Sequence, residues 1–172
     1  LEVASGSGEY VNYFAKKLSH LTWQPSDIDL PALDSIAEWT RINELEEYVY
    51  PPIVIDVNED NWPINQSMNI VSILAINLIH IAPLHTCTNL FRNANKILAK
   101  NGLVYFYGPF KFGGKHISSS NIDFDTYLTS QNPEWGVRDI EKIMMIAKET
   151  GFSMRDTIKM PANNHSIIFE KS

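Results

Sequence analysis

This chain of 172 residues has a single cysteine, no long uninterrupted apolar run and no excess of basic residues. Cys87 is the only cysteine, so no disulfide can form within the chain, and we expect a reducing, cytoplasmic location. The longest apolar stretch, residues 70–83, is interrupted by Ser72, Asn77 and His80, which argues against a membrane span. The net charge of -6 argues against nucleic acid as a partner, because phosphate binding needs clustered Lys and Arg.

What is present is an ordinary globular composition, with 44% hydrophobic and 20% charged residues. The length predicts one domain over residues 1–172, large enough for a substantial core. Apolar segments of strand length alternate with amphipathic helical segments. Strands are expected at the start of the chain and at 21–24, 52–55, 69–76, 103–107, 152–160 and 165–170. Helices are expected over 9–19, from 30 onward, and over 84–100, 123–129 and 138–150.

Strands that alternate with helices predict an α/β fold, with a mostly parallel sheet and helices on both faces. The last two predicted strands are joined by only a few residues, so they must be antiparallel. Pro25 cannot donate to a strand ladder, so the second strand should end there, with Ser26 and Asp27 in the loop beyond it. Residues 110–121, rich in Gly and Ser, are expected to be a long irregular segment.

The first eight residues read as a short buried strand that runs into a glycine-containing turn. Gly6 and Gly8 lack β-carbons, so the backbone there can pass close to a ligand and adopt positive φ. The N–H groups that open the next helix could donate to polar atoms of that ligand. A tight strand-to-helix turn without a ligand is the alternative, and two glycines alone do not decide between them.

The residues that follow parallel strands should meet at one edge of the sheet, where open α/β folds bind ligands. Asp27 lies 19 residues after Gly8, close to the offset at which an acid accepts hydrogen bonds from ribose hydroxyls. Asp27 is therefore a candidate ribose ligand, and the alternative is a turn residue. Asp29 is interpreted as the cap of the second helix.

The turn favours S-adenosylmethionine over a dinucleotide. The dinucleotide fingerprint needs a third glycine at a position that Val11 occupies, and no Arg or Lys lies in the turn to meet a pyrophosphate. Adenosylmethionine carries no phosphate and has a cationic sulfonium. Glu2 and Glu9 on either side of the turn suit it better.

The turn Glu2-x-Ala4-x-Gly6-x-Gly8, with Asp27 and Asp56, resembles that of class I S-adenosylmethionine-dependent methyltransferases. More narrowly, the chain resembles the family of methyltransferase-like protein twenty-six and its bacterial relatives. The segments that carry this resemblance are LTWQPSDID at 21–29, NLIHIAP at 77–83, YGPF at 107–110, NPEWGVRD at 132–139 and MPANN at 160–164.

The resemblance implies a Rossmann-like sheet of seven strands, the last antiparallel, with S-adenosylmethionine as cofactor. It also implies a segment before Leu1 that closes over the cofactor. Within the turn it implies cofactor contacts from Glu2, Ala4, Gly6 and Gly8. Gly6 and Gly8 would approach the methionine part, and Ala4 stands in place of the usual first glycine. Elsewhere the implied cofactor contacts are Asp27 to the ribose, Asp56 to the adenine amino group, Val57 to the ring and Asn77 to the backbone side of the cofactor.

On the substrate side we expect His80 and Asn164 to be the catalytic residues, because both follow predicted strands at the ligand edge. A structural histidine is the alternative for His80, and ordinary turn residues are the alternative for the asparagines. The further substrate-binding candidates are Tyr107, Ser120, Asn121 and Asn163. No metal site is expected, because the four residues that could form one, His85, His116, Asp123 and Asp125, lack tight ligand spacing.

The function predicted from the sequence is methyl transfer to a small molecule. Methyltransferases that act on nucleobases commonly carry Asn/Asp-Pro-Pro-aromatic after the fourth strand, where this chain has Asn77-Leu78-Ile79-His80. A catalytically silent module that keeps the fold to bind the cofactor or a protein partner is the alternative. Polar groups that converge on the methyl position would favour the enzyme.

Overall fold

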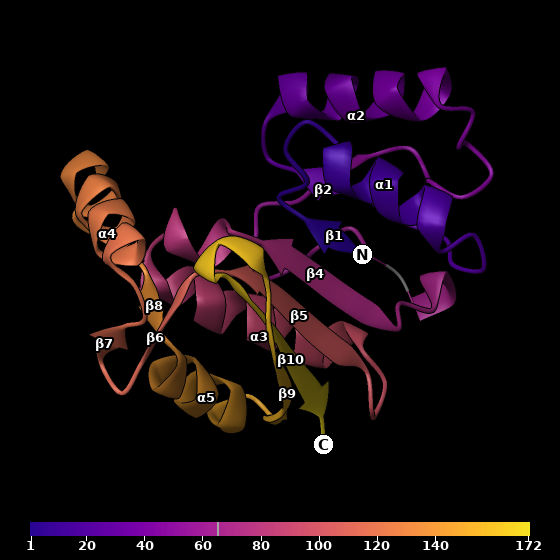
Figure 1. Ribbon diagram of the computed structural model, residues 1–172. Coiled ribbons are helices and arrows are strands. Elements are labelled where there is room, and N and C mark those ends of the chain that lie inside the picture. The colour runs from indigo at the N-terminus through magenta and orange to yellow at the C-terminus, as the bar shows by residue number, and fades with distance from the viewer. Residues whose placement is uncertain (65) are drawn as a thin grey trace. The chain divides into compact units, whose positions relative to one another are not determined.

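The computed structural model describes residues 1–64 and 66–172 and divides the chain into two compact units, Leu1–Asn65 and Gln66–Ser172. Figure 1 shows the first unit in indigo and purple and the second in magenta through yellow. In the described part of the chain, no helix is both long enough and apolar enough to cross a membrane. The two units are considered separately.

The first unit consists of short strands and two helices. Its elements are β1 (Glu2–Val3), α1 (Glu9–Lys17), β2 (Ser26–Asp27), α2 (Leu30–Ile42) and β3 (Ile53–Val54). Strands β2 and β3 are parallel, with Asp27 opposite Val54. The backbone N–H of Glu2 donates to the carbonyl of Gln24, which aligns β1 with the segment that leads into β2. As predicted, Asp29 occupies the N-cap of α2, although its side chain makes no capping hydrogen bond.

The predicted end of the second strand at Pro25 is wrong. The strand lies over Ser26 and Asp27, and Pro25 itself is bridged to Glu2. Proline lacks the N–H but keeps a carbonyl, and the carbonyl of Pro25 accepts from the N–H of Ile53 at 3.2 Å. A proline is therefore tolerated here because only its acceptor faces the neighbouring strand.

The second unit contains a mixed sheet. The largest sheet of the structure has five strands, not the seven that were predicted, and four of them lie in this unit in the order β4-β5-β10-β9. The elements of this unit, in chain order, are η1 (Gln66–Met68), β4 (Ser72–Ile76), η2 (Leu78–His80), α3 (Leu84–Ile97), β5 (Leu103–Gly108), β6 (Phe110–Phe112), β7 (Lys115–His116), α4 (Ser119–Gln131), β8 (Arg138–Asp139), α5 (Ile140–Glu149), β9 (Phe152–Lys159), η3 (Pro161–Asn163) and β10 (His165–Lys171).

The strand directions bring three loops to one edge. Strands β4 and β5 are parallel, and β10 is antiparallel both to β5 and to β9, as predicted for the final hairpin. Strand β9 therefore runs in the direction of β4 and β5. His165 lies opposite both Gly108 and Lys159, so the turn between β9 and β10 lies beside the exit of β5 (Figure 1).

An aromatic cluster forms the core of this unit. The ring of Phe91, on α3, lies 5.1–5.5 Å from the rings of Phe106, Phe152 and Phe169 on three neighbouring strands. The residues of α3 and α5 that face the sheet are fully buried, whereas residues such as Tyr105 on the opposite face are only half-buried. The prediction of helices on both faces is thus not confirmed within this unit.

The predicted irregular segment 110–121 is instead a hairpin followed by a helix. Strands β6 and β7 are antiparallel and join β8 in a second, three-stranded sheet. Gly113 and Gly114, both at positive φ, form the tight turn between β6 and β7 and supply the conformation that a two-residue hairpin requires. Their N–H groups donate to the carboxylates of Glu141 and Asp139. The sequence shows the glycines, but it does not show the acids that hold them.

We expect Phe91→Ala to lower the free energy of unfolding by about 3–5 kcal/mol, because it leaves a cavity among three rings. Urea denaturation followed by circular dichroism measures the loss. The matched control is Phe124→Ala on α4, where the side chain is 37% exposed, and this variant should lose less than about 1 kcal/mol. Equal losses for the two variants would contradict this description of the core.

Candidate functional site

In the first unit, one carboxylate organises the glycine turn. Oδ2 of Asp27 accepts from the N–H of Gly6 at 2.8 Å, and Oδ1 accepts from the N–H of Asp29 at 3.0 Å. Asp27 is only 8% exposed. Each carboxylate oxygen has a second lone pair, so Asp27 can still accept from a ligand hydroxyl while it holds the turn. Asp27 therefore stays a candidate ribose ligand.

The surroundings of the two glycines in the turn differ. A β-carbon on Gly8 would lie 2.9 Å from Cα of Ile36, so Gly8 is required for the contact between α1 and α2. A β-carbon on Gly6 would meet nothing within 4 Å. Of the two, only Gly6 presents backbone to open space. Ala4 also has positive φ, 54°, a conformation that costs about 1 kcal/mol for a residue with a β-carbon and that glycine would relieve.

Glu2 supplies a buried carboxylate in the same turn. Glu2 is 1% exposed, and its Oε2 has no hydrogen-bond partner among the described residues. Burial raises the pKa of Glu2 to about 7. The hydroxyls of Ser5 and Ser26 both donate to the backbone carbonyl of Glu2, at 3.3 and 2.8 Å, which fixes its backbone. An unpaired buried oxygen of this kind suits a cationic or hydrogen-bond-donating ligand group.

Asp56 and Val57 lie just beyond β3, at the same end as Asp27, the last residue of β2. The N–H of Ile55 donates to the carbonyl of Asp27 at 3.2 Å, so the exits of the two strands are adjacent. Oδ1 of Asp56 accepts from the N–H of Asn58, and the side chain of Val57 is buried. The structure thus gathers most of the predicted cofactor residues in one unit, namely Glu2, Ala4, Gly6, Gly8, Asp27, Asp56 and Val57. Asn77 belongs to the other unit.

In the second unit, amide side chains link the turn after β9 to its neighbours. Nδ2 of Asn164 donates to the hydroxyl of Tyr107 at 3.1 Å. Nδ2 of Asn121 donates to the carbonyl of Asn163 at 3.3 Å, and Nδ2 of Asn163 donates to Oγ of Ser120 at 3.2 Å. The five predicted substrate-side residues named here therefore form two hydrogen-bonded groups, which the adjacent residues Asn163 and Asn164 bring side by side, although they come from three separate parts of the sequence.

His80 is the last residue of η2, the short 3-10 helix that follows β4. The residue is fully buried, its ring packs edge-on against Phe110 at 5.1 Å, and neither ring nitrogen has a partner among the described residues. A β-carbon on Gly108 would lie 2.5 Å from Nε2 of His80 and 3.1 Å from Oδ1 of Asn77, so a glycine is needed there. Burial lowers the pKa of His80 to about 3, and the charge of Arg138 acts in the same direction. His80 is therefore a neutral imidazole.

Arg138 positions the His80 loop, a role that the sequence did not reveal. Its Nε donates to the carbonyl of Ile79 at 2.7 Å, and one terminal nitrogen donates to the carbonyls of Ala82 and Glu134. The carbonyl of His80 accepts from the N–H of Gly136 at 2.9 Å. The only available signal was the Asn-Pro-Glu-Trp-Gly-Val-Arg-Asp motif, which marks the segment but not its partner.

A cavity of about 420 Å³ opens beside the turn after β9. Asn163 and Asn164 line it together with residues that the sequence analysis did not select, including Phe112 and His165. The volume is in the range of small-molecule sites. Among the described residues, no group of three or more His, Cys, Asp or Glu side chains could hold a metal ion.

A family model described as "Protein of unknown function (DUF938)" matches residues 1–171. The chain belongs to this family. The narrower resemblance to methyltransferase-like protein twenty-six stays a prediction.

Several solved structures share the fold. The O-methyltransferase family 2 protein from Planctomyces limnophilus DSM 3776, in complex with apigenin, is 20% identical with a TM-score of 0.84, over 99% of this chain and 50% of that one. Mitomycin 7-O-methyltransferase MmcR is 10% identical with a TM-score of 0.85, over 99% of this chain and 48% of that one. The O-methyltransferase NcsB1 from neocarzinostatin biosynthesis, in complex with S-adenosylmethionine and 2-hydroxy-5-methyl naphthoic acid, is 10% identical with a TM-score of 0.80, over 99% of this chain and 48% of that one.

The α/β fold of the chain, with its mixed parallel and antiparallel sheet, therefore matches the fold of these O-methyltransferase structures. At 10–20% identity the likeness of these three structures extends to the fold alone. The chain spans about half the length of each of these proteins.

We expect Gly8→Ala to cost about 2–4 kcal/mol of stability, because the new methyl group strikes the backbone of Ile36 and φ is +87°. Gly6→Ala meets no neighbour and should cost only about 1–2 kcal/mol for its positive φ. Thermal and urea denaturation of the two variants compare them directly. A Gly6 variant less stable than the Gly8 variant would show that the packing described for this turn is wrong.

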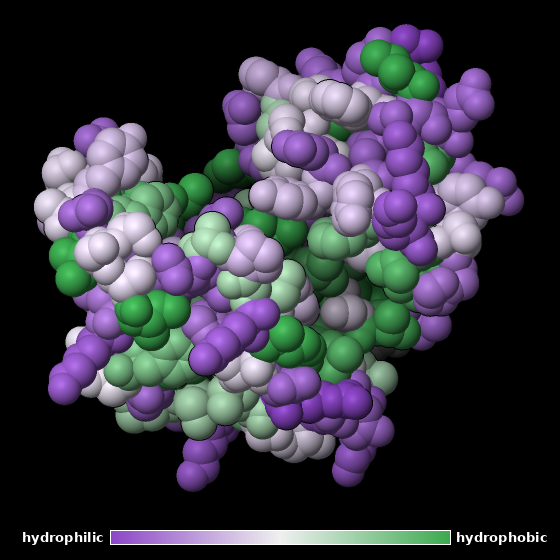
Figure 2. All heavy atoms as spheres, in the orientation of Figure 1, coloured by the Kyte–Doolittle hydropathy of each residue, from purple (hydrophilic) through white to green (hydrophobic). Residues whose placement is uncertain are grey.

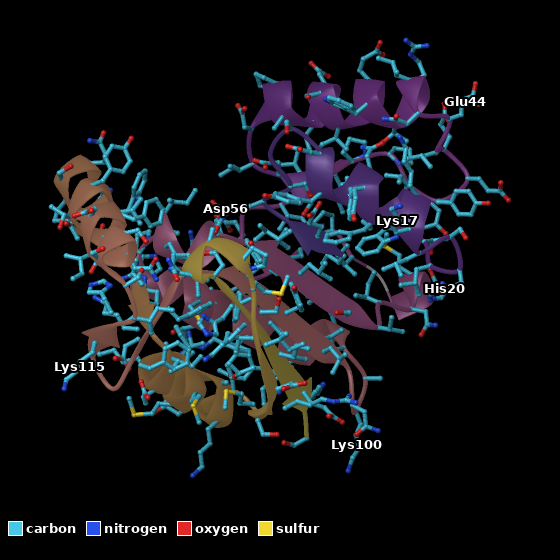
Figure 3. The ribbon with its side chains drawn as sticks, viewed as in Figure 1. Lys17, His20, Glu44, Asp56, Lys100 and Lys115 are labelled. Carbon is cyan, nitrogen blue, oxygen red and sulfur yellow. The ribbon has the colours of Figure 1, made fainter. Side chains whose placement is uncertain are left out.

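The buried His80 should make the protein less stable in acid. Between its ordinary pKa of 6.5 and the lowered value of about 3, the unfolded chain binds a proton at residue 80 that the folded chain refuses. The free energy of unfolding should therefore fall as the pH is lowered through that window. His80→Gln should reduce the slope of this pH dependence by up to about 1.4 kcal/mol per pH unit. Urea titrations from pH 7 to 4 measure it, with His20→Gln as the control, because His20 is exposed (Figure 3). An unchanged slope in the His80 variant would disprove the burial argument.

Proposed function

We propose that this protein is an S-adenosylmethionine-dependent methyltransferase that acts on a small molecule. The observation that carries the proposal is the Asp27 carboxylate, which holds the N–H of Gly6 and keeps spare acceptor capacity at the exit of β2. The methyltransferase fold supports it, as do the ligands named for the neighbours, S-adenosylmethionine, apigenin and a naphthoic acid.

The residues of the first unit fit the proposed cofactor. Asp27 is an acceptor for ribose hydroxyls, and Gly6 leaves room beside its backbone. The unpaired Oε2 of Glu2 suits the ammonium of the methionine part. No lysine or arginine lies in the turn, as expected for a ligand without phosphate. Asp56 and Val57 would meet the adenine, and Asn77 the backbone side of the cofactor.

When bound, the cofactor would supply an electrophilic methyl group, which bonds to the acceptor atom in line as its bond to sulfur breaks, with S-adenosylhomocysteine as the leaving group. Such a step depends mainly on positioning, so the contribution of the protein is to hold the acceptor and to manage its proton. Asn163 and Asn164 line the cavity and offer amide groups for orientation. Ser120 and Tyr107 accept from those amides, and Asn121 donates to the backbone carbonyl of Asn163. His80, the other predicted catalytic residue, does not line this cavity, and its lowered pKa of about 3 opposes a role as proton acceptor, so we assign it to packing against Phe110 rather than to proton transfer.

The convergence of these polar groups favours an enzyme over a silent module. A module that only kept the fold would have no need of hydrogen-bonded amide side chains beside a cavity. The narrower assignment to the relatives of methyltransferase-like protein twenty-six is part of this proposal and rests on the five sequence segments quoted above.

Calorimetry with S-adenosylhomocysteine tests the proposal. We expect measurable binding, and Asp27→Ala should weaken it by about 1–3 kcal/mol through the loss of a charged acceptor. Asp34→Ala, at an exposed acid on α2, is the matched control and should bind as the unchanged protein does. Asp27→Asn, which keeps one oxygen for the turn, separates ligand contact from folding. Tight NADH binding with no response to S-adenosylhomocysteine would refute the assignment.

A further inference from the structure

The cavity in the second unit has features that restrict what can bind there. Its apolar walls include Phe112, Ile117 and Met160. Ile117 is 45% exposed, so its side chain is accessible to a ligand in the cavity. Figure 2 shows hydrophobic side chains, in green, among hydrophilic ones, in purple, over β6, β7 and the η3 turn.

One wall of the cavity is aromatic. The ring of Phe112 lies 4.8 Å from the ring of His165, at an angle of 57°. Aromatic side chains attract other rings in stacked or edge-on arrangements, and the thioether of Met160 makes favourable contacts with ring edges. A flat aromatic ligand can use all three of these side chains, whereas a flexible aliphatic one would gain only from contact area.

The polar side of the cavity has unused hydrogen-bonding capacity. His165 is 4% exposed, and its Nδ1 has no partner among the described residues. Asn163 and Asn164 each donate one amide hydrogen bond to the surrounding structure, so their side-chain oxygens and second amide hydrogens stay available. A ligand with an oxygen-bearing group could pair with these atoms.

The charge of the cavity lining has one sign. Lys159 is the one charged residue that lines it, and no Asp or Glu of the described chain does so. The positive charge of Lys159 is close enough to help lower the pKa of His165, after the larger effect of burial. An anionic ligand group would be attracted here, and a cationic one would be repelled.

We propose that this cavity binds the methyl acceptor and that the acceptor is a small aromatic acid, with its carboxylate toward Lys159 and His165 and its ring against Phe112. This inference rests on the proposed function, because it names the substrate class for the same reaction. The fit follows from the volume, the aromatic wall and the single sign of charge.

Three probes of similar size separate the contributions of charge and of aromaticity. They are 4-hydroxybenzoate, its neutral amide 4-hydroxybenzamide, and the non-aromatic acid 4-hydroxycyclohexanecarboxylate. Binding is followed by NMR on protein labelled at His and Met, with the signals of His165 and Met160 as reporters of the cavity. We expect 4-hydroxybenzoate to bind most tightly and to raise the pKa of His165, because a nearby anion stabilises the charged imidazole.

Two pairs of variants test the residues. Lys159→Gln should weaken 4-hydroxybenzoate about threefold, as expected for an exposed ion pair, and leave the amide unchanged. Lys100→Gln removes the same charge from the far end of the unit (Figure 3) and should have no effect. Ile117→Asp places a carboxylate at the cavity and should reverse the preference for the acid. Ile122→Asp, at a similarly exposed isoleucine that does not line the cavity, should not.

Each outcome separates this inference from the proposed function. Binding of S-adenosylhomocysteine without any cavity response to the aromatic acid would overturn the inference and leave the methyltransferase assignment intact. A cavity response to the acid with no binding of S-adenosylhomocysteine would overturn the assignment, and with it the role of the acid as acceptor. Tighter binding of the amide, or of the cyclohexane acid, would overturn the charge or the aromatic argument respectively.

Discussion

The insertion of β10 between β5 and β9 determines which side chains of the second unit meet. Because β10 is antiparallel to both neighbours, it begins at the edge where β5 and β9 end. The turn before it therefore lies beside the exit of β5, and Asn164 reaches the hydroxyl of Tyr107, 57 residues away in the sequence. The cavity, the amide group and the aromatic pair of Phe112 and His165 all depend on this one strand order.

Both units contain buried polar groups that the fold itself does not use. Oε2 of Glu2 and the ring nitrogens of His80 lack partners in the described chain. An unpaired buried polar group lowers stability, so a fold retains it where a ligand or a reaction needs it. In a core built only for stability, such positions would be apolar. At Glu2 this cost is consistent with the proposed cofactor site, whereas the ring of His80 is enclosed by Phe110 and Gly108.

The sequence predicted the elements better than their connections. Hydrophobic periodicity located the helices α1, α3 and α5 and the final hairpin, because these depend on local spacing and on a short connection. Two predictions failed. The second strand was expected to end at Pro25, but the neighbouring strand needs only the carbonyl of that proline. Residues 110–121 were expected to be irregular, but the acids Asp139 and Glu141 hold a glycine turn there. Both errors concern partners that lie far away along the chain.

For the site, the sequence alone determined the residue types and their order: the glycine turn, the acids at Asp27 and Asp56, and the asparagines after β9. Residue types follow from local chemistry, so a spacing and a motif were enough. Only the tertiary structure decided that Gly8 serves helix packing while Gly6 stays open, that His80 is sealed and neutral, and that Arg138 holds its loop. Burial, pKa and long-range hydrogen bonds depend on what surrounds a group in space, and a linear sequence does not record those neighbours.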